Sequence, residues 1–345
     1  MNQKQRLIAA LELREPDMIP TFEVSIDRKI NFSLTGTEDP FDLVEKLGLD
    51  GVVVKPDYEK RSISKNTYVD EWGAKRQITS EFIADVIESP IKDITDAKHY
   101  VFPKPDSRHR FKTLEKAVER FGDTRAIILN LRDVFSDLRD LIGYEELLVC
   151  LITRINEVKE LLEKTTAFNR ELARVAHETF GIDILITTDD ICYPKGLLFS
   201  PKVYWEVFAT KFEQVIKSFK EIGYYCIKHC DGDITQVIDH WIHSGIDCIH
   251  PLDPSAKMDL GAFKKKYGDQ ICLAGSVDCM GALTSGSLEE VENDVKECIK
   301  KAAKGGGFIL TSSNTIHSGV RPENYEKMVE TVRQYGKYPI DFEKL

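Results

Sequence analysis

Short apolar runs alternate with longer amphipathic stretches along most of this 345-residue chain. Each run is rich in β-branched or other strand-forming residues and ends at a turn or a polar side chain. The eight runs are Met18–Val24, Gly51–Lys55, Ala126–Asn130, Ile184–Asp189, Tyr225–Cys230, Ile246–His250, Ile271–Ser276 and Gly307–Ser312. Near-continuous apolar runs of this length are typical of parallel strands that are covered on both faces.

Helical spacing of apolar residues predicts the elements that cover these strands. The predicted helices span Asp39–Leu47, Tyr144–His177, Pro201–Ile222, Asp233–Ser244, Leu288–Ala303 and Pro322–Tyr335. Eight strands alternating with helices favour an α/β fold of the closed (β/α)8 type, a TIM barrel. An open doubly wound sheet is disfavoured, because no glycine-rich phosphate loop follows the first run.

Residues 56–125 interrupt the alternation. The segments DYEKR, VDEWGAKRQ and VFPKPDSRHR in this range are polar and contain turn-forming residues. They predict a hairpin-bearing insertion between the second and third strands. Residues 1–345 are otherwise expected to form a single barrel domain.

Composition excludes several functional classes. With 47 Lys and Arg against 57 Asp and Glu, the net charge of −10 argues against a nucleic-acid partner. No apolar run approaches the ~20 residues that cross a bilayer, and the N-terminus does not resemble a signal peptide. We therefore expect a cytoplasmic protein with no membrane partner. The eight cysteines form no C-x-x-C pair and are expected to be buried thiols.

Polar residues stand at or just beyond the ends of the predicted strands, where barrel enzymes place their active sites. Any one of them can cap a helix, but together they indicate an active site. The catalytic candidates are Glu23, Asp189, Asp190, His229 and Asp231. The substrate-binding candidates are Asp57, Asn130, Arg132, His250, Asn314 and His317.

The end of the fifth strand is the most informative part of this set. Side chains alternate along a strand, so His229 and Asp231 share one face and Cys230 lies on the other. His229 and Asp231 are candidate metal ligands, or an imidazole oriented by a carboxylate. Alternatively, Asp231 only begins a turn and His229 is a hydrogen-bonded core residue. By the same alternation, one of Asp189 and Asp190 faces the barrel mouth, and the other caps the following loop.

Several segments, in order and spacing, resemble the uroporphyrinogen decarboxylase superfamily over almost the whole chain. They are RLIAALELREPDMIP, YVDEWGAKR, TTDDICYPKGLLFSPKVY, KHCDGDI, LAGSVD and RPENYEKMVETV. The resemblance implies a barrel enzyme, and superfamily members often pair as homodimers. True decarboxylases carry an arginine-rich clamp that the segment FEVSIDRKINF lacks. Asp57 matches their aspartate after strand two, whereas their strand-eight histidine falls at about Asn314.

The second chemical class of the superfamily is similar to this chain and consists of cobalamin-dependent methyltransferases. Those that act on coenzyme M bind zinc through His-x-Cys after strand five and a further Cys after strand eight. Here His229 is kept, Asp231 replaces the first Cys, and Asn314 or a neighbouring serine replaces the second. The resemblance thus makes His229 and Asp231 candidate ligands of zinc or of a harder metal.

The resulting hypothesis is a corrinoid-dependent methyltransferase of the O-demethylase type. It moves a methyl group from a small donor, such as a methoxylated aromatic, to cob(I)alamin on a partner corrinoid protein. One alternative is a decarboxylase-like lyase, which needs a cationic clamp such as Arg28, Arg132 and Arg321. A second alternative is a non-catalytic barrel that binds a corrinoid or tetrapyrrole.

Overall fold

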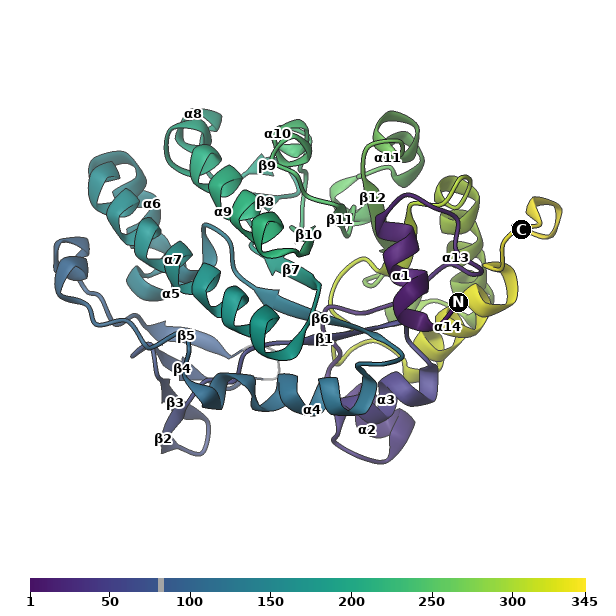
Figure 1. The fold of residues 1–345 in the computed structure, drawn as a ribbon, viewed down its shortest axis with the longest axis horizontal. Coiled ribbons are helices and arrows are strands. Elements are labelled where there is room, and N and C mark those ends of the chain that lie inside the picture. The colour runs from purple at the N-terminus through teal and green to yellow at the C-terminus, as the bar shows by residue number, and fades with distance from the viewer. Residues whose placement is uncertain (80–83) are drawn as a thin grey trace.

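The computed structural model describes residues 1–79 and 84–345. Seven parallel strands form one curled sheet, in the order β1-β6-β7-β10-β11-β12-β13 (Figure 1). Their bounds are Gly51–Val54 (β1), Ala126–Leu131 (β6), Ile184–Thr188 (β7), Tyr225–His229 (β10), Cys248–His250 (β11), Cys272–Val277 (β12) and Phe308–Ser312 (β13). Each strand overlaps a predicted run, so the parallel α/β sheet is confirmed.

The predicted eighth strand, Met18–Val24, forms only isolated bridges, and a closed eight-stranded barrel is not confirmed. The carbonyl of Pro20 accepts a hydrogen bond from the amide of Leu310 in β13. The carbonyl of Thr21 accepts from Gly51 at the start of β1. The segment therefore touches both edges of the sheet. Because Pro20 has no N–H to donate, a continuous ladder cannot run through it.

Helices surround the outside of the sheet, as Figure 1 shows for α7, α9, α11, α13 and α14. The bounds are Gln3–Leu11 (α1), Arg28–Thr35 (α2), Pro40–Leu47 (α3), Lys112–Phe121 (α4), Ser136–Ile142 (α5), Tyr144–Thr153 (α6), Ile155–Phe180 (α7), Pro201–Val203 (α8), Ala209–Ile222 (α9), Ile238–His243 (α10), Leu260–Tyr267 (α11), Ala282–Ser285 (α12), Leu288–Ala302 (α13) and Pro322–Tyr335 (α14). Short 3-10 turns cover Ile94–His99, Arg108–Phe111, Pro254–Ala256 and Phe342–Lys344.

Three predicted helices differ from those in the structure. The stretch Tyr144–His177 is two helices, because the backbone of Arg154 leaves the helical region between α6 and α7. The stretch Pro201–Ile222 contains a π-helical turn over Tyr204–Phe208. Helix α10 begins only at Ile238, after a loop that starts at Asp233. Local backbone geometry of this kind is not encoded in apolar spacing.

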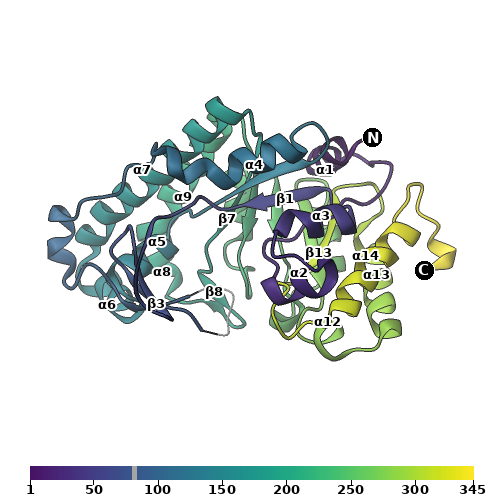
Figure 2. The same ribbon diagram turned by 90° about the horizontal axis from the view of Figure 1, so that it is seen from below.

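The segment between β1 and β6 carries a four-stranded antiparallel sheet. Its strands are Lys60–Ser64 (β2), Thr67–Asp70 (β3), Lys75–Gln77 (β4) and Asp85–Glu88 (β5). Figure 2 shows this sheet on the opposite side of the molecule from α2 and α3. A small hairpin, Cys192–Tyr193 (β8) with Gly196–Leu197 (β9), follows β7.

Two hydrophobic clusters support the sheet. The larger one packs the surrounding helices against its outer face, and the smaller one fills its concave side. The smaller cluster includes Leu7 and Ala10 of α1, packed with Ile128, Ile186 and Ile227 from the strands. Helix α1 thereby covers the interior away from the carboxyl ends of the strands, which are left for a site. Among the described residues, no helix has the length and apolar character needed to cross a membrane.

Candidate functional site

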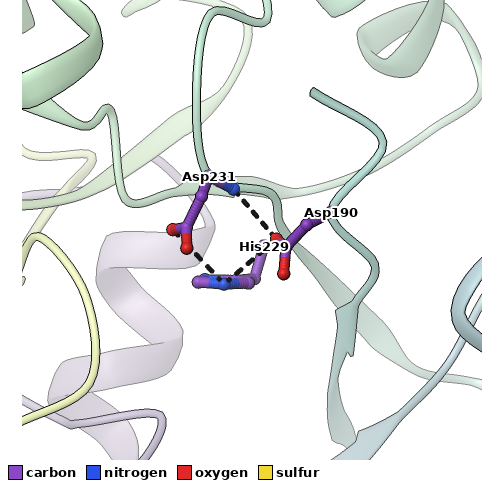
Figure 3. Close-up of side chains that lie close together, drawn as sticks. All are labelled: Asp190, His229 and Asp231. Atoms are coloured by element: carbon purple, nitrogen blue, oxygen red, sulfur yellow. Dashed lines mark hydrogen bonds and ion pairs between the residues drawn. The ribbon is translucent and has the colours of Figure 1, made fainter. Parts of the chain in front are cut away.

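Asp190, His229 and Asp231 meet at the carboxyl ends of the neighbouring strands β7 and β10 (Figure 3). One ligand atom from each lies within 4.8 Å of the others. The Nε2 atom of His229 is 3.6 Å from Oδ1 of Asp190 and 3.6 Å from Oδ1 of Asp231. The backbone N–H of Asp231 donates to Oδ1 of Asp190 at 3.0 Å, which joins the two loops. We call these three residues the Asp-His-Asp cluster.

His250 and Asn314 form hydrogen bonds with residues of the cluster. His250, at the end of β11, is the register partner of His229, and their Nδ1 atoms are 2.7 Å apart. One of the two rings must donate a proton to the other at this distance. The amide of Asn314 donates to Oδ2 of Asp231 at 2.7 Å. His250 and Asn314 thus orient the histidine and one aspartate of the cluster.

The cluster fits a divalent metal ion. Within the described chain, Oδ1 of Asp231 is buried without a hydrogen-bond partner, although it points at the imidazole. Such an orphaned acceptor is costly unless a cation or proton satisfies it. When His229 donates Nδ1–H to His250, its Nε2 lone pair faces the same space. The donor set of two carboxylates and one imidazole suits zinc and also harder ions.

Burial controls the protonation of these groups. Desolvation lowers the pKa of His229 to about 4, and it lowers the pKa of His250 as well. Desolvation also raises the pKa of Asp231, and the nearby Asp190 charge raises it further. The imidazole is therefore neutral near pH 7, which is the form that binds metals or accepts a proton.

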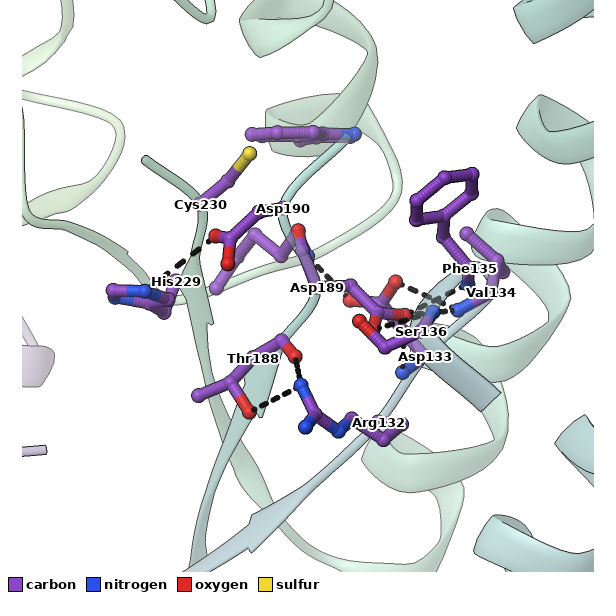
Figure 4. A network of polar contacts seen from close by, with 12 residues as sticks. Arg132, Asp133, Val134, Phe135, Ser136, Thr188, Asp189, Asp190, His229 and Cys230 are labelled. Atoms are coloured by element: carbon purple, nitrogen blue, oxygen red, sulfur yellow. Dashed lines mark hydrogen bonds and ion pairs between the residues drawn. The ribbon is translucent and has the colours of Figure 1, made fainter. Parts of the chain in front are cut away.

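Asp189 points away from the cluster, as Figure 4 shows. Its carboxylate accepts four backbone N–H groups, those of Asp133, Val134, Phe135 and Ser136, at 2.7–2.9 Å. These hydrogen bonds and the Lys228 charge hold the pKa of Asp189 well below its usual range, despite burial. The residue fixes the loop that leads into α5 and is not a member of the cluster. Asp190 is thus the aspartate that faces the site.

Lys228, which sequence reasoning did not single out, lies on the other face of β10 and is 1% exposed. Its ammonium donates to Oδ2 of Asp133 at 2.6 Å and to the carbonyl of Asp189 at 3.0 Å. A lysine within an otherwise apolar run was the available signal, because a buried lysine requires a carboxylate partner. Cys230, on the same face, packs into the outer core as the alternation predicts.

Glu23 lies in the irregular segment beside β13 and is connected to the cluster through Ser312, whose hydroxyl contacts both Glu23 and the carbonyl of Asn314. Its carboxyl accepts hydrogen bonds from the amide of Ser312 at 3.1 Å and from its hydroxyl at 2.5 Å. Burial raises the pKa of Glu23 to about 8, although Ser312 opposes the shift. The side chain is therefore mostly a neutral acid near pH 7. It lines a cavity of about 390 Å³ together with Arg28, Lys55 and Asp57.

The remaining sequence candidates make the following hydrogen bonds. Asp57 accepts from the amide and hydroxyl of Thr113, both at 2.7 Å, and so caps α4. Asn130 accepts from the hydroxyl of Thr188 at 2.8 Å, and Arg132 donates to the carbonyl of Thr188. His317 bonds Thr284 of α12 at 3.3 Å. In the ranges the structure describes, no hydrogen bond or ion pair links His317 to the Asp-His-Asp cluster.

The model of the family described as uroporphyrinogen decarboxylase (URO-D) matches residues 72–335. The chain belongs to the uroporphyrinogen decarboxylase family. The predicted resemblance to the uroporphyrinogen decarboxylase superfamily is therefore confirmed. A search of curated proteins found no sequence match.

The fold of this family member is similar to those of several solved structures. It is similar to a methyltransferase from Methanosarcina mazei, with 16% identity, a TM-score of 0.76, and coverage of 97% of this chain and 99% of that one. It is also similar to a B12-independent methionine synthase from Shewanella sp. W3-18-1. That match has 10% identity, a TM-score of 0.51, and coverage of 92% and 96%. At these identities, the likeness shows a shared fold.

Proposed function

We propose that this uroporphyrinogen decarboxylase family member is a methyltransferase. It takes a methyl group from a small donor, a methoxylated aromatic, and delivers it to cob(I)alamin on a partner corrinoid protein. The Asp-His-Asp cluster at the strand ends is the observation that carries the proposal. Membership of an enzymatic family and the shared fold with a methyltransferase support it.

The chemical problem in such a reaction is the leaving group. As the methyl carbon departs, both electrons of its bond to oxygen remain on that oxygen, and a phenolate or alkoxide forms unless a proton arrives. Glu23 is neutral near pH 7 and lines a cavity, so it can supply this proton. A general acid contributes about 10²–10⁴-fold to a rate. Water then returns the proton to the Glu23 carboxylate.

Asp190, His229 and Asp231 are the residues that would hold a metal ion. Such an ion, when bound, polarises an oxygen of the substrate as a Lewis acid. His250 hydrogen-bonds the imidazole of His229, and Asn314 keeps Asp231 directed at it. Buried partners of this kind fix ligand positions before the substrate arrives.

The decarboxylase alternative receives less support from the geometry. Arg321 pairs with Glu323 at the start of α14, and Arg28 and Arg132 line different cavities. These three guanidinium groups therefore form no common clamp for the carboxylated substrate of such a lyase.

The test is methyl transfer under anaerobic conditions with cob(I)alamin and a pool of methoxylated aromatics and methylamines. We expect methylcobalamin to appear only when both protein and donor are present. The His229→Ala and Asp190→Asn variants should lose at least 100-fold in rate, because each loses a group of the cluster. Asp233→Asn, in the exposed turn after the cluster, is the matched control and should retain the rate. Unchanged transfer by a folded His229→Ala protein contradicts the proposal.

A further inference from the structure

A second cavity, of about 300 Å³, lies between the antiparallel sheet β2–β5 and helix α5. Its lining combines aromatic rings with cationic side chains: Lys55, Tyr58, Lys60, Tyr68, Trp72 and Arg132. Rings of this kind pack against a planar ligand, and cations select its charge. Because Lys55 also lines the cavity that contains Glu23, the two cavities adjoin at this residue.

Most N–H groups of the Arg132 guanidinium, which lines this cavity, have no hydrogen-bond acceptor within the described residues. One of its terminal nitrogens donates to the carbonyl of Thr188 and lies 3.5 Å from the hydroxyl of the same residue. In residues 1–79 and 84–345, the Arg132 side chain makes no other hydrogen bond and no ion pair. A guanidinium presents a planar fork of N–H groups that matches a carboxylate in a bidentate manner.

The acidic residues around the cavity do not take up this fork. Asp70 and Asp140 both bind Arg76, at 2.6 Å and 2.7 Å. Asp137 accepts a hydrogen bond from Asn169 at 2.6 Å, and burial raises its pKa to about 7, so it is only partly charged near neutral pH. The cavity can therefore accept the single negative charge of a ligand.

The guanidinium is also close to the Asp-His-Asp cluster. Thr188, whose carbonyl accepts a hydrogen bond from Arg132, is the register partner of His229 (Figure 4). A small ligand anchored at Arg132 therefore has its charged end within electrostatic reach of the cluster.

We propose that Arg132 binds a carboxylate of the methyl donor. The donor is then a methoxylated aromatic acid, and not a neutral ether or a methylamine. This inference rests on the proposed function, which it makes more specific. Binding, however, is measured without methyl transfer, so the two can fail independently.

The experiment compares 4-methoxybenzoate with its uncharged counterpart 4-methoxybenzamide, by isothermal titration calorimetry on the full chain without any corrinoid. We expect the wild-type protein to bind the benzoate at least about tenfold more tightly, because a charge-assisted bidentate pair is lost with the amide. Arg132→Gln should remove this preference, and Arg132→Lys, which keeps the charge but not the fork, should retain part of it. Arg61→Gln is the matched control, because Arg61 lies on the exposed strand β2 outside the lining of the cavity, and it should keep the full preference.

Three results would overturn the proposal. They are equal affinity of the wild-type protein for both compounds, no binding of the benzoate at millimolar concentration, and an undiminished preference in Arg132→Gln. If the preference is present but methyl transfer fails, the carboxylate subsite stands and the proposed function does not. If methyl transfer occurs from neutral donors without a carboxylate preference, the proposed function stands and the subsite does not.

Discussion

Asp189 and Asp190 are adjacent in the chain, yet their carboxylates serve opposite faces of β7. Asp189 accepts four backbone N–H groups in the core, whereas Asp190 lies 3.6 Å from the imidazole of His229. Alternation of side chains along a strand separates the two groups. One aspartate therefore stabilises the loop that leads into α5, and the other belongs to the Asp-His-Asp cluster.

The two positions predict different losses of folding stability when each aspartate is replaced by asparagine. Asp189→Asn replaces a charged acceptor with an amide whose NH₂ faces backbone donors, so the free energy of unfolding should fall by about 2–4 kcal/mol. Asp190→Asn, at a side chain that is 42% exposed, should change it by less than about 1 kcal/mol. Urea denaturation followed by circular dichroism measures both. Equal losses in the two variants would contradict the assigned positions.

Metal binding should depend on all three members of the Asp-His-Asp cluster. We expect the protein, after chelation and dialysis against zinc, to hold about one ion per chain, as measured by plasma emission spectroscopy. His229→Ala, Asp190→Asn and Asp231→Asn should each weaken zinc binding at least tenfold, because each removes a ligand. Asp233→Asn should bind as the wild-type protein does. Full zinc occupancy in His229→Ala would falsify this site.

For the buried Lys228–Asp133 pair, we expect removal of one partner to destabilise the protein more than removal of both. Lys228→Met leaves the Asp133 carboxylate in the core without its cation, which should cost about 3–5 kcal/mol of unfolding free energy. In the double variant Lys228→Met/Asp133→Asn no buried charge remains, so a large part of that loss should return. Denaturant midpoints of the two variants provide the comparison. If the double variant is less stable than Lys228→Met, the pair is not the source of the cost.

The raised pKa of Glu23 makes stability depend on pH. Between the ordinary value of 4.5 and about 8, the folded protein binds more protons at this site than the unfolded chain does. The contribution of Glu23 to stability therefore decreases as the pH rises through this window, by at most about 5 kcal/mol. Glu23→Gln should be less sensitive than the wild-type protein between about pH 5 and pH 8.5, as judged by urea midpoints.

Glu290→Gln is a control for that experiment. Its carboxylate belongs to the exposed capping box of α13 and has a lowered pKa, so it titrates below the window. Its midpoints should be offset from those of the wild-type protein by the same amount at both pH values. Parallel profiles for Glu23→Gln and the wild-type protein would show that Glu23 does not titrate in this range.

Period-two alternation was sufficient to place His229 and Asp231 together and Cys230 away from them. Alternation also required that Asp189 and Asp190 diverge, but it could not say which one faces the site. That choice depends on the loop at Asp133–Ser136, whose N–H groups capture Asp189. The contact between His229 and His250 depends on the register of β10 against β11, which one sequence does not reveal.

The fold was predictable where apolar runs are long and uninterrupted, as in β6 and β12. It was not predictable at Met18–Val24, where the missing N–H of Pro20 outweighs the strand propensity of its neighbours. The ion pair of Lys228 with Asp133 joins residues 95 positions apart, so no local pattern could reveal it. Long-range pairing of this kind becomes visible only when the strands are assembled.

The hydrogen bonds of Glu23 with Ser312 have a consequence for how the protein is made. They join residues that are 289 positions apart, almost the full length of the chain. During synthesis, the segment that carries Glu23 leaves the ribosome long before β13 exists, and its acid group stays in water until then. Burial raises the pKa of this acid while its hydrogen bonds with Ser312 lower it, so the neutral form is favoured only after the late part of the chain has folded around it.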